Sequence, residues 1–112
     1  MAENKLADLS MDFAVSILKV TDGIKGHYSL INQLERSATS IGANIREAKY
    51  AHSKADFISK LQIALKECYE TEYWLELLLE SGYYSNKNTL ESCIEIKRIL
   101  IASINTAKEK NK

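Results

Sequence analysis

The segment of residues 29–50 places its apolar side chains at an unbroken alternation of three and four residues. The positions are Ile31, Leu34, Ala38, Ile41, Ile45 and Ala48. Because an α-helix turns once every 3.6 residues, this spacing gathers the side chains into one narrow stripe, the kind along which helices pack in bundles. No segment shows the alternation of apolar and polar residues that is typical of a half-buried strand. The chain is therefore predicted to be all-α.

Apolar residues at helical spacing also fill three other segments. We predict helices over residues 5–24, 29–50, 53–81 and 88–108. Ser53 followed by Asp56 is typical of a helix N-cap. Asn88 followed by Glu91 predicts another, and Gly82 is placed to end the third helix. Because such short breaks force neighbouring helices to run antiparallel, we expect one domain over residues 1–112, an up-down-up-down four-helix bundle.

The predicted helices carry more apolar surface than one bundle core uses. In the fourth helix the apolar side chains spread over an arc of about 220°, whereas a core stripe needs somewhat more than about 100°. The first and third helices carry second apolar stripes as well. Monomers seldom leave such patches to water, so we predict a closed homo-oligomer. Its candidate interface residues are Met11, Val15, Leu18, Trp74, Leu77, Ile94 and Ile101.

Two charged residues fall inside apolar stripes. Glu72 projects within about 60° of the core direction of the third helix, and Lys97 lies within the apolar arc of the fourth. A buried carboxylate needs a partner or a raised pKa. We expect both side chains to reach water along their stems or to pair across an interface, rather than to act as a catalytic acid and base.

The chain lacks the motifs of common enzyme and cofactor classes. It has no phosphate-binding glycine loop, no nucleophile elbow and no CxxC pair. His27 and His52 fall in loops at opposite ends of the expected bundle, on the order of 30 Å apart, so they cannot share a metal ion. Cys68 and Cys93 are expected to be reduced core thiols, offset by about 13 Å and thus too distant for a disulfide. We predict no enzyme activity, cofactor, metal or small-molecule substrate.

Charge is balanced in total but unevenly distributed. Residues 36–66 contain six basic and two acidic residues, whereas residues 67–80 contain five glutamates and no base. Around the second predicted loop, and aided by the basic tail of residues 108–112, cations and rings could contact phosphates and bases. The candidate nucleic-acid contacts are Arg46, Lys49, Tyr50, His52 and Lys54. Without a signal-like N-terminal segment or an apolar run of about 20 residues, the protein is expected in the cytoplasm, away from membranes.

A longer sequence pattern is more specific for a protein family than the features above. It runs Gln33-x-x-Arg36-Ser37-Ala38-x-Ser40-Ile41-x-x-Asn44-Ile45-x-Glu47, and continues with Phe57-Ile58-x-x-Leu61-x-Ile63-Ala64 and Glu70-x-Glu72-x-x-Leu75. On these residues the chain resembles the four-helix-bundle family encoded in intervening sequences of bacterial 23S rRNA genes. The resemblance implies a homopentamer. It also implies a link to nucleic acid, because a relative is the accessory protein of diversity-generating retroelements.

The resemblance further implies a polar network between the second and third helices. Its expected members are Arg36, Asn44, Glu47, Glu70 and Glu72. The functional expectation is a non-enzymatic interaction protein whose partner is RNA or an RNA-handling protein. The alternative is a structural or protein-binding scaffold that makes no contact with nucleic acid.

Overall fold

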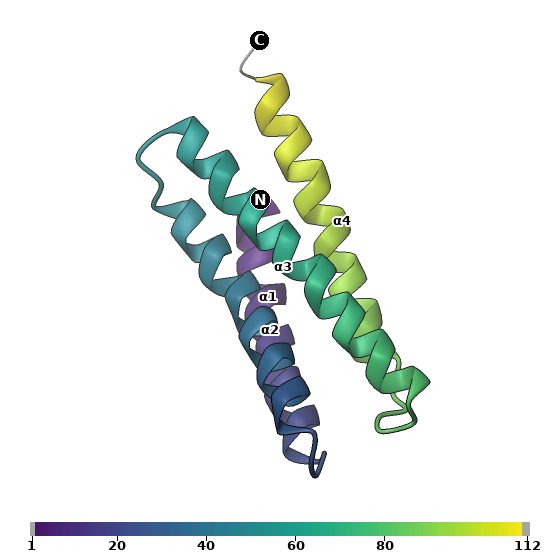
Figure 1. Cartoon of the computed structure of the whole chain (residues 1–112). Helices are drawn as coiled ribbons and strands as arrows, with labels where there is room; N and C mark the ends of the chain where they lie inside the picture. The colour runs from purple at the N-terminus through teal and green to yellow at the C-terminus, as the bar shows by residue number, and fades with distance from the viewer. Residues whose placement is uncertain (1, 111–112) are drawn as a thin grey trace.

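The chain folds into four α-helices in a bundle (Figure 1). The structure, a computed structural model, describes the backbone of residues 2–110 and the side chains of residues 4–110. The helices are α1 (Ala2–Asp22), α2 (Tyr28–Lys49), α3 (Lys54–Glu80) and α4 (Asn88–Glu109). No strand occurs among the described residues. The prediction of an all-α, four-helix fold is confirmed.

The helices form a closed cycle of neighbours. The pairs α1 with α2, α2 with α3, α3 with α4 and α1 with α4 are in contact, and in the described chain the diagonal pairs are not. Short connections bring each helix back beside the one before it, as an antiparallel bundle requires. The particle is a rod with extents of 48 × 20 × 19 Å. Helices α1 and α3 therefore occupy opposite corners of this rod.

The apolar stripe found in the sequence forms the core. All six stripe positions of α2 are buried, and Leu34, Ala38 and Ile41 are completely so. Every buried side-chain nitrogen and oxygen among the described residues has a hydrogen-bond partner. None of the described helices is both long and apolar enough to cross a membrane.

Helix starts follow local hydrogen bonding. At α3, the Ser53 Oγ accepts from the Asp56 backbone N–H at 3.0 Å, so the predicted N-cap is confirmed. At α4, the predicted Asn88 cap is wrong. Asn88 is already helical, Lys87 holds the cap position, and the Asn86 Oδ1 accepts from the Asn88 N–H at 2.9 Å. The side chain that satisfies this helix start thus lies two residues earlier than expected.

Gly82 ends α3 and reverses the chain. Its φ of +80° is left-handed, which suits glycine because no Cβ is present to clash. The Tyr83 N–H donates to the Leu78 carbonyl at 3.1 Å and the Gly82 N–H to that of Leu79 at 3.2 Å, a Schellman motif. The connection then returns towards α4, where the hydroxyls of Tyr84 and Thr89 are hydrogen-bonded.

This early reversal sets how far α4 is shifted along α3. Cys68 and Cys93 are both free and buried, as expected of reduced core thiols. The expected offset of about 13 Å is wrong. The Cys93 Sγ lies 3.6 Å from the Cys68 carbonyl oxygen, because the chain turns at Gly82 rather than in the middle of the connection.

The same alignment of α3 and α4 brings together the two charged residues that lie in apolar stripes. The Lys97 Nζ lies 2.7 Å from the Glu72 Oε1, and both side chains are about one-fifth exposed. This bond raises the pKa of Lys97 above its ordinary value. The Lys97 ammonium also lies 5.3 Å from the Tyr69 ring centroid. Glu72 and Lys97 therefore pair with each other within the chain, rather than across an interface as one of the two expectations had it.

Candidate nucleic-acid interface

Five candidate contact residues surround the connection between α2 and α3. Arg46 and Lys49 belong to the last turn of α2, where the helix dipole favours positive charge. Tyr50 and His52 follow in the connection, and Lys54 is the first residue of α3. All five side chains are exposed. This end of the bundle therefore presents cations and rings from one short stretch of chain.

Tyr50 has an exposed ring, and its backbone is held by a hydrogen bond. Its side chain is 71 % exposed, which leaves it free for stacking. Its backbone N–H donates to the Glu47 carbonyl at 3.1 Å and so closes α2. The Lys49 Nζ lies 5.8 Å from the ring centroid. A base that stacked on this ring would have a positive charge beside it.

The cations of this end are not engaged by acids. Arg46, Lys49 and Lys54 form no ion pair with any described acidic side chain. The nearby Lys60 differs, because its Nζ lies 3.2 Å from the Glu47 Oε1. The three exposed cations thus keep their charge available for phosphate groups.

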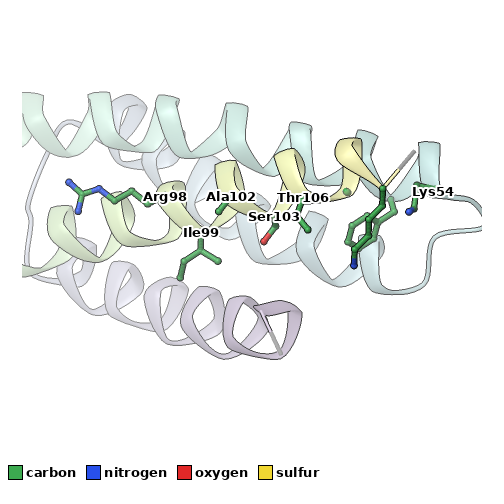
Figure 2. Close-up of a pocket in the computed structure, with 9 residues that line it drawn as sticks. Lys54, Arg98, Ile99, Ala102, Ser103 and Thr106 are labelled. Atoms are coloured by element: carbon green, nitrogen blue, oxygen red, sulfur yellow. The ribbon is translucent and has the colours of Figure 1, made fainter. Parts of the chain in front are cut away.

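Two surface pockets flank this end of the bundle. The first, of about 700 Å³, lies between α1 and α2 and includes Arg46, Lys49 and Tyr50. The second, of about 490 Å³, follows α4 and includes Lys54 (Figure 2). Phe57, which is half-buried in the first turns of α3, lines both pockets. Both volumes fall within the range of about 300–1,000 Å³ that is typical of ligand sites.

The second pocket contains residues that the sequence patterns did not mark as a site. Figure 2 shows Arg98 at one end and Lys54 at the other. Between them lies one face of α4, on which residues recur every four positions: Arg98, Ala102, Thr106 and Lys110, with Ile99, Ser103 and Ala107 beside them. Lys110 belongs to the predicted basic tail, whereas Asn111 and Lys112 lie outside the described residues. The periodicity was visible in the sequence, but its small side chains gave no chemical signal.

The polar network between α2 and α3 centres on Arg36. Its guanidinium donates to Glu70 and, at 3.3 Å, to the Glu67 Oε2. The Trp74 Nε1–H donates to the Glu70 Oε2 at 3.0 Å. Arg36 first, and then Trp74, hold the pKa of the Glu70 carboxyl below its usual range. Beneath them the Thr71 hydroxyl donates to the Ser37 Oγ at 2.8 Å.

Only part of the expected network exists. Arg36 and Glu70 are joined as expected, and Glu47 makes a separate bridge to Lys60. Glu72 does not take part, because it faces α4 and pairs with Lys97. The Asn44 side chain does not take part in this network either. Its Nδ2 donates to the Ser40 carbonyl of its own helix at 2.9 Å, a bond that a mid-helix amide can make locally.

The candidate interface residues divide into a group on α1 and a group on α3 and α4. The group on α1 is 43 to 51 % exposed and consists of Met11, Val15 and Leu18. The group on α3 and α4 is less open and consists of Trp74, Leu77, Ile94 and Ile101. Leu77 and Ile101 are each 36 % exposed, and Trp74 and Ile94 are half-buried. Because α1 and α3 occupy opposite corners, the exposed residues of these two helices face different sides of the rod.

The histidines lie far from each other in the fold. His27, in the connection between α1 and α2, packs against Tyr83 with the ring centroids 4.4 Å apart and the ring planes tilted by 59°. His52 lies in the connection between α2 and α3, which is the other end of the bundle. In the part of the chain that the structure describes, no group of three His, Cys, Asp or Glu side chains could hold a metal ion.

Comparison with known proteins gives matches over most of the chain. The family model described as 23S rRNA-intervening sequence protein matches residues 2–102. A crystal structure of a protein of unknown function, from the S23 ribosomal protein family of Bacteroides thetaiotaomicron, is 44 % identical with a TM-score of 0.87. The alignment covers 94 % of this chain and 99 % of that one. A search of curated proteins finds no match.

Proposed function

The chain belongs to the 23S rRNA-intervening sequence protein family, and we propose that it acts as a non-enzymatic, oligomeric protein that binds RNA. The matched region spans all of α1, α2 and α3 and most of α4. Neither this family nor the solved relative is described as an enzyme. The proposal therefore depends on surfaces rather than on a reaction centre.

One observation carries the RNA-binding proposal: basic side chains from three helices converge at one end of the bundle. Arg46 and Lys49 come from α2, Lys54 from α3, and Lys110 from the end of α4. None of them pairs with a described acidic side chain. A chain with a net charge of zero can hold phosphates only where cations gather locally. This end meets that condition.

Ion pairs within the chain also favour RNA binding over a scaffold whose subunits are held together by opposite charges. Such a scaffold would set the basic end against the glutamates of residues 67–80 in a neighbouring subunit. Glu67, Glu70 and Glu72 are already paired inside the subunit, with Arg36 and Lys97. The acidic segment therefore has less charge to offer a neighbour than its composition suggests.

The two groups of candidate interface residues support a closed ring of subunits. A cyclic assembly of more than two subunits needs two different patches on each subunit, because every interface joins one patch to the other. The α1 group and the residues of α3 lie on opposite corners of the bundle and could meet this need. Five subunits is the number that the family resemblance implies.

The test of RNA binding combines Arg46→Ala, Lys49→Ala and Lys54→Ala in one variant. We expect the parent to bind RNA at roughly 50 mM salt, where phosphate contacts are strong, and the variant to lose this binding. Fluorescence anisotropy of a labelled RNA measures both affinities, and sedimentation confirms that the oligomer is intact. A variant that binds like the parent would contradict the site. A parent that does not bind at all would favour the scaffold.

A matched control removes the same charge elsewhere. Lys19, Lys25 and Lys87 are exposed and form no ion pair with described acids. The triple change of these lysines to alanine lowers the net charge equally but leaves the basic end untouched. We expect it to bind RNA nearly as well as the parent. An equal loss in both variants would mean that total charge, rather than this site, governs binding.

The oligomer is tested with Ile101→Glu. Ile101 is 36 % exposed on α4, so a carboxylate there could be solvated in the monomer but not inside an apolar interface. Sedimentation equilibrium should show the parent as a multiple of 12.7 kDa at micromolar concentration. The variant should dissociate while its circular dichroism stays helical. A monomeric parent would refute the assembly, and an unfolded variant would show that Ile101 belongs to the core.

A further inference from the structure

Among the described residues, Phe57 is shared by the two pockets at the basic end. It lines the pocket between α1 and α2 and also the pocket along α4. Its backbone N–H donates to the Ser53 carbonyl at 2.9 Å, within the capped first turn of α3. The ring is therefore carried by a well-anchored helix start. We call the two pockets together the Phe57 cleft.

Both pockets that contain Phe57 also contain cations. The pocket between α1 and α2 supplies Arg46 and Lys49, and the pocket along α4 supplies Lys54 and Lys110. A phosphate backbone that crosses the cleft would meet positive charge before and after Phe57. Such an alternation of cations and an aromatic ring is the common arrangement for binding single strands.

The half-buried position of Phe57 distinguishes a single strand from a duplex. In a duplex the bases are stacked inside, and a half-buried ring cannot reach them. An unpaired base can leave the stack and enter a pocket of about 490 Å³. There the hydroxyls of Ser103 and Thr106 lie along the α4 wall as possible partners for its polar edge.

We propose that the Phe57 cleft binds a short single-stranded segment of RNA, with one unstacked base against Phe57 and phosphates on the cations at either side. This inference rests on the proposed RNA-binding function and specifies the form of RNA that is bound. It adds Phe57, which the sequence analysis did not include in the candidate site, and it selects Lys110 from the predicted basic tail. It also predicts a preference that a purely electrostatic surface would not have.

The first test compares a single-stranded RNA with a duplex of the same length. The parent should bind the single strand more tightly, and Phe57→Leu should weaken that binding about tenfold, because base stacking on an aromatic ring is lost. Duplex binding should be unchanged. Tyr28→Leu, at the exposed start of α2 and the far end of the bundle, is the matched control and should change neither affinity.

A second pair of variants tests the cleft without altering a half-buried ring. Lys110 lines the pocket along α4, whereas the nearby Lys108 is exposed but does not. Lys110→Ala should reduce the slope of log affinity against log salt by about 0.7 for a single strand, and Lys108→Ala should leave the slope unchanged. This comparison holds even if Phe57→Leu does not fold.

The outcomes separate this inference from the proposed function. Single-strand preference with losses in Phe57→Leu and Lys110→Ala supports the cleft. Equal or tighter binding of the duplex, or unchanged affinity in both variants, overturns the cleft while RNA binding stands. Failure of the parent to bind either RNA at roughly 50 mM salt overturns the proposed function, and the cleft with it.

Discussion

At the residue scale, Glu70 connects two helices through one carboxylate. It accepts hydrogen bonds from Arg36 on α2 and from Trp74 on its own helix. These bonds favour the ionised form and hold the pKa of Glu70 below its usual range. The folded pKa is thus lower than the unfolded one. The ionised carboxylate therefore stabilises the fold above the unfolded pKa, and this contribution fades as the pH falls through the folded pKa.

Glu70→Gln tests this linkage. At about pH 7 we expect the variant to lose roughly 0.2–1 kcal/mol of unfolding free energy, the range for ion pairs that are partly exposed. The difference from the parent should shrink as the pH falls below the usual carboxyl range. Urea unfolding at fixed protein concentration measures this difference in unfolding free energy. Glu76→Gln, at an exposed site with no described ion pair, is the control. A loss that is independent of pH would contradict the linkage.

Residue environments could be predicted from the sequence, but partners could not. Helical angles placed Glu72 and Lys97 beside apolar stripes and placed both cysteines in the core, and the structure agrees. Which side chains meet depends on how far α4 is shifted along α3. That shift follows from the reversal at Gly82, whose hydrogen bonds lie within residues 77–83. Periodicity carries no information about such a shift.

At the scale of elements, the Ser53 cap fixes where α3 begins. Its side chain satisfies the Asp56 N–H, and its carbonyl accepts from Phe57. Ser53→Ala should lower the unfolding free energy by about 1 kcal/mol, because one helix-start N–H loses its partner. Ser59→Ala, at an exposed position inside α3, should change it by less than about 0.5 kcal/mol. Urea unfolding by circular dichroism measures both. Equal effects would show that the cap adds no stability.

The helices themselves were predictable because each carries a stripe with the helical period. Their boundaries were predictable where a side chain caps the backbone, as at Ser53, and where glycine takes a left-handed conformation, as at Gly82. The start of α4 at residue 88 was also predicted, but its cap was not, because Lys87 holds the cap position and the Asn86 side chain accepts from the Asn88 N–H. Residue type alone favours Asn86 and Asn88 equally as caps.

At the scale of the whole molecule, the candidate site divides into a part visible in the sequence and a part that is not. Arg46, Lys49 and Lys54 flank one connection, so their proximity follows from chain order alone. Phe57 and Lys110 lie more than 50 residues apart and meet at one pocket only because α3 packs beside α4. A neutral chain gains RNA affinity from such local clusters, and a ring would multiply weak contacts by avidity.

Sedimentation velocity of the protein with a labelled single-stranded RNA tests the central claim most directly, because it reports assembly and binding together. At roughly 50 mM salt we expect the RNA to sediment with a particle several times heavier than the 12.7 kDa subunit. At roughly 200 mM salt the RNA should sediment freely while the protein particle persists, because counterion release weakens phosphate contacts but not apolar interfaces. RNA that sediments alone at the lower salt, or protein that sediments as a single subunit, would contradict the account.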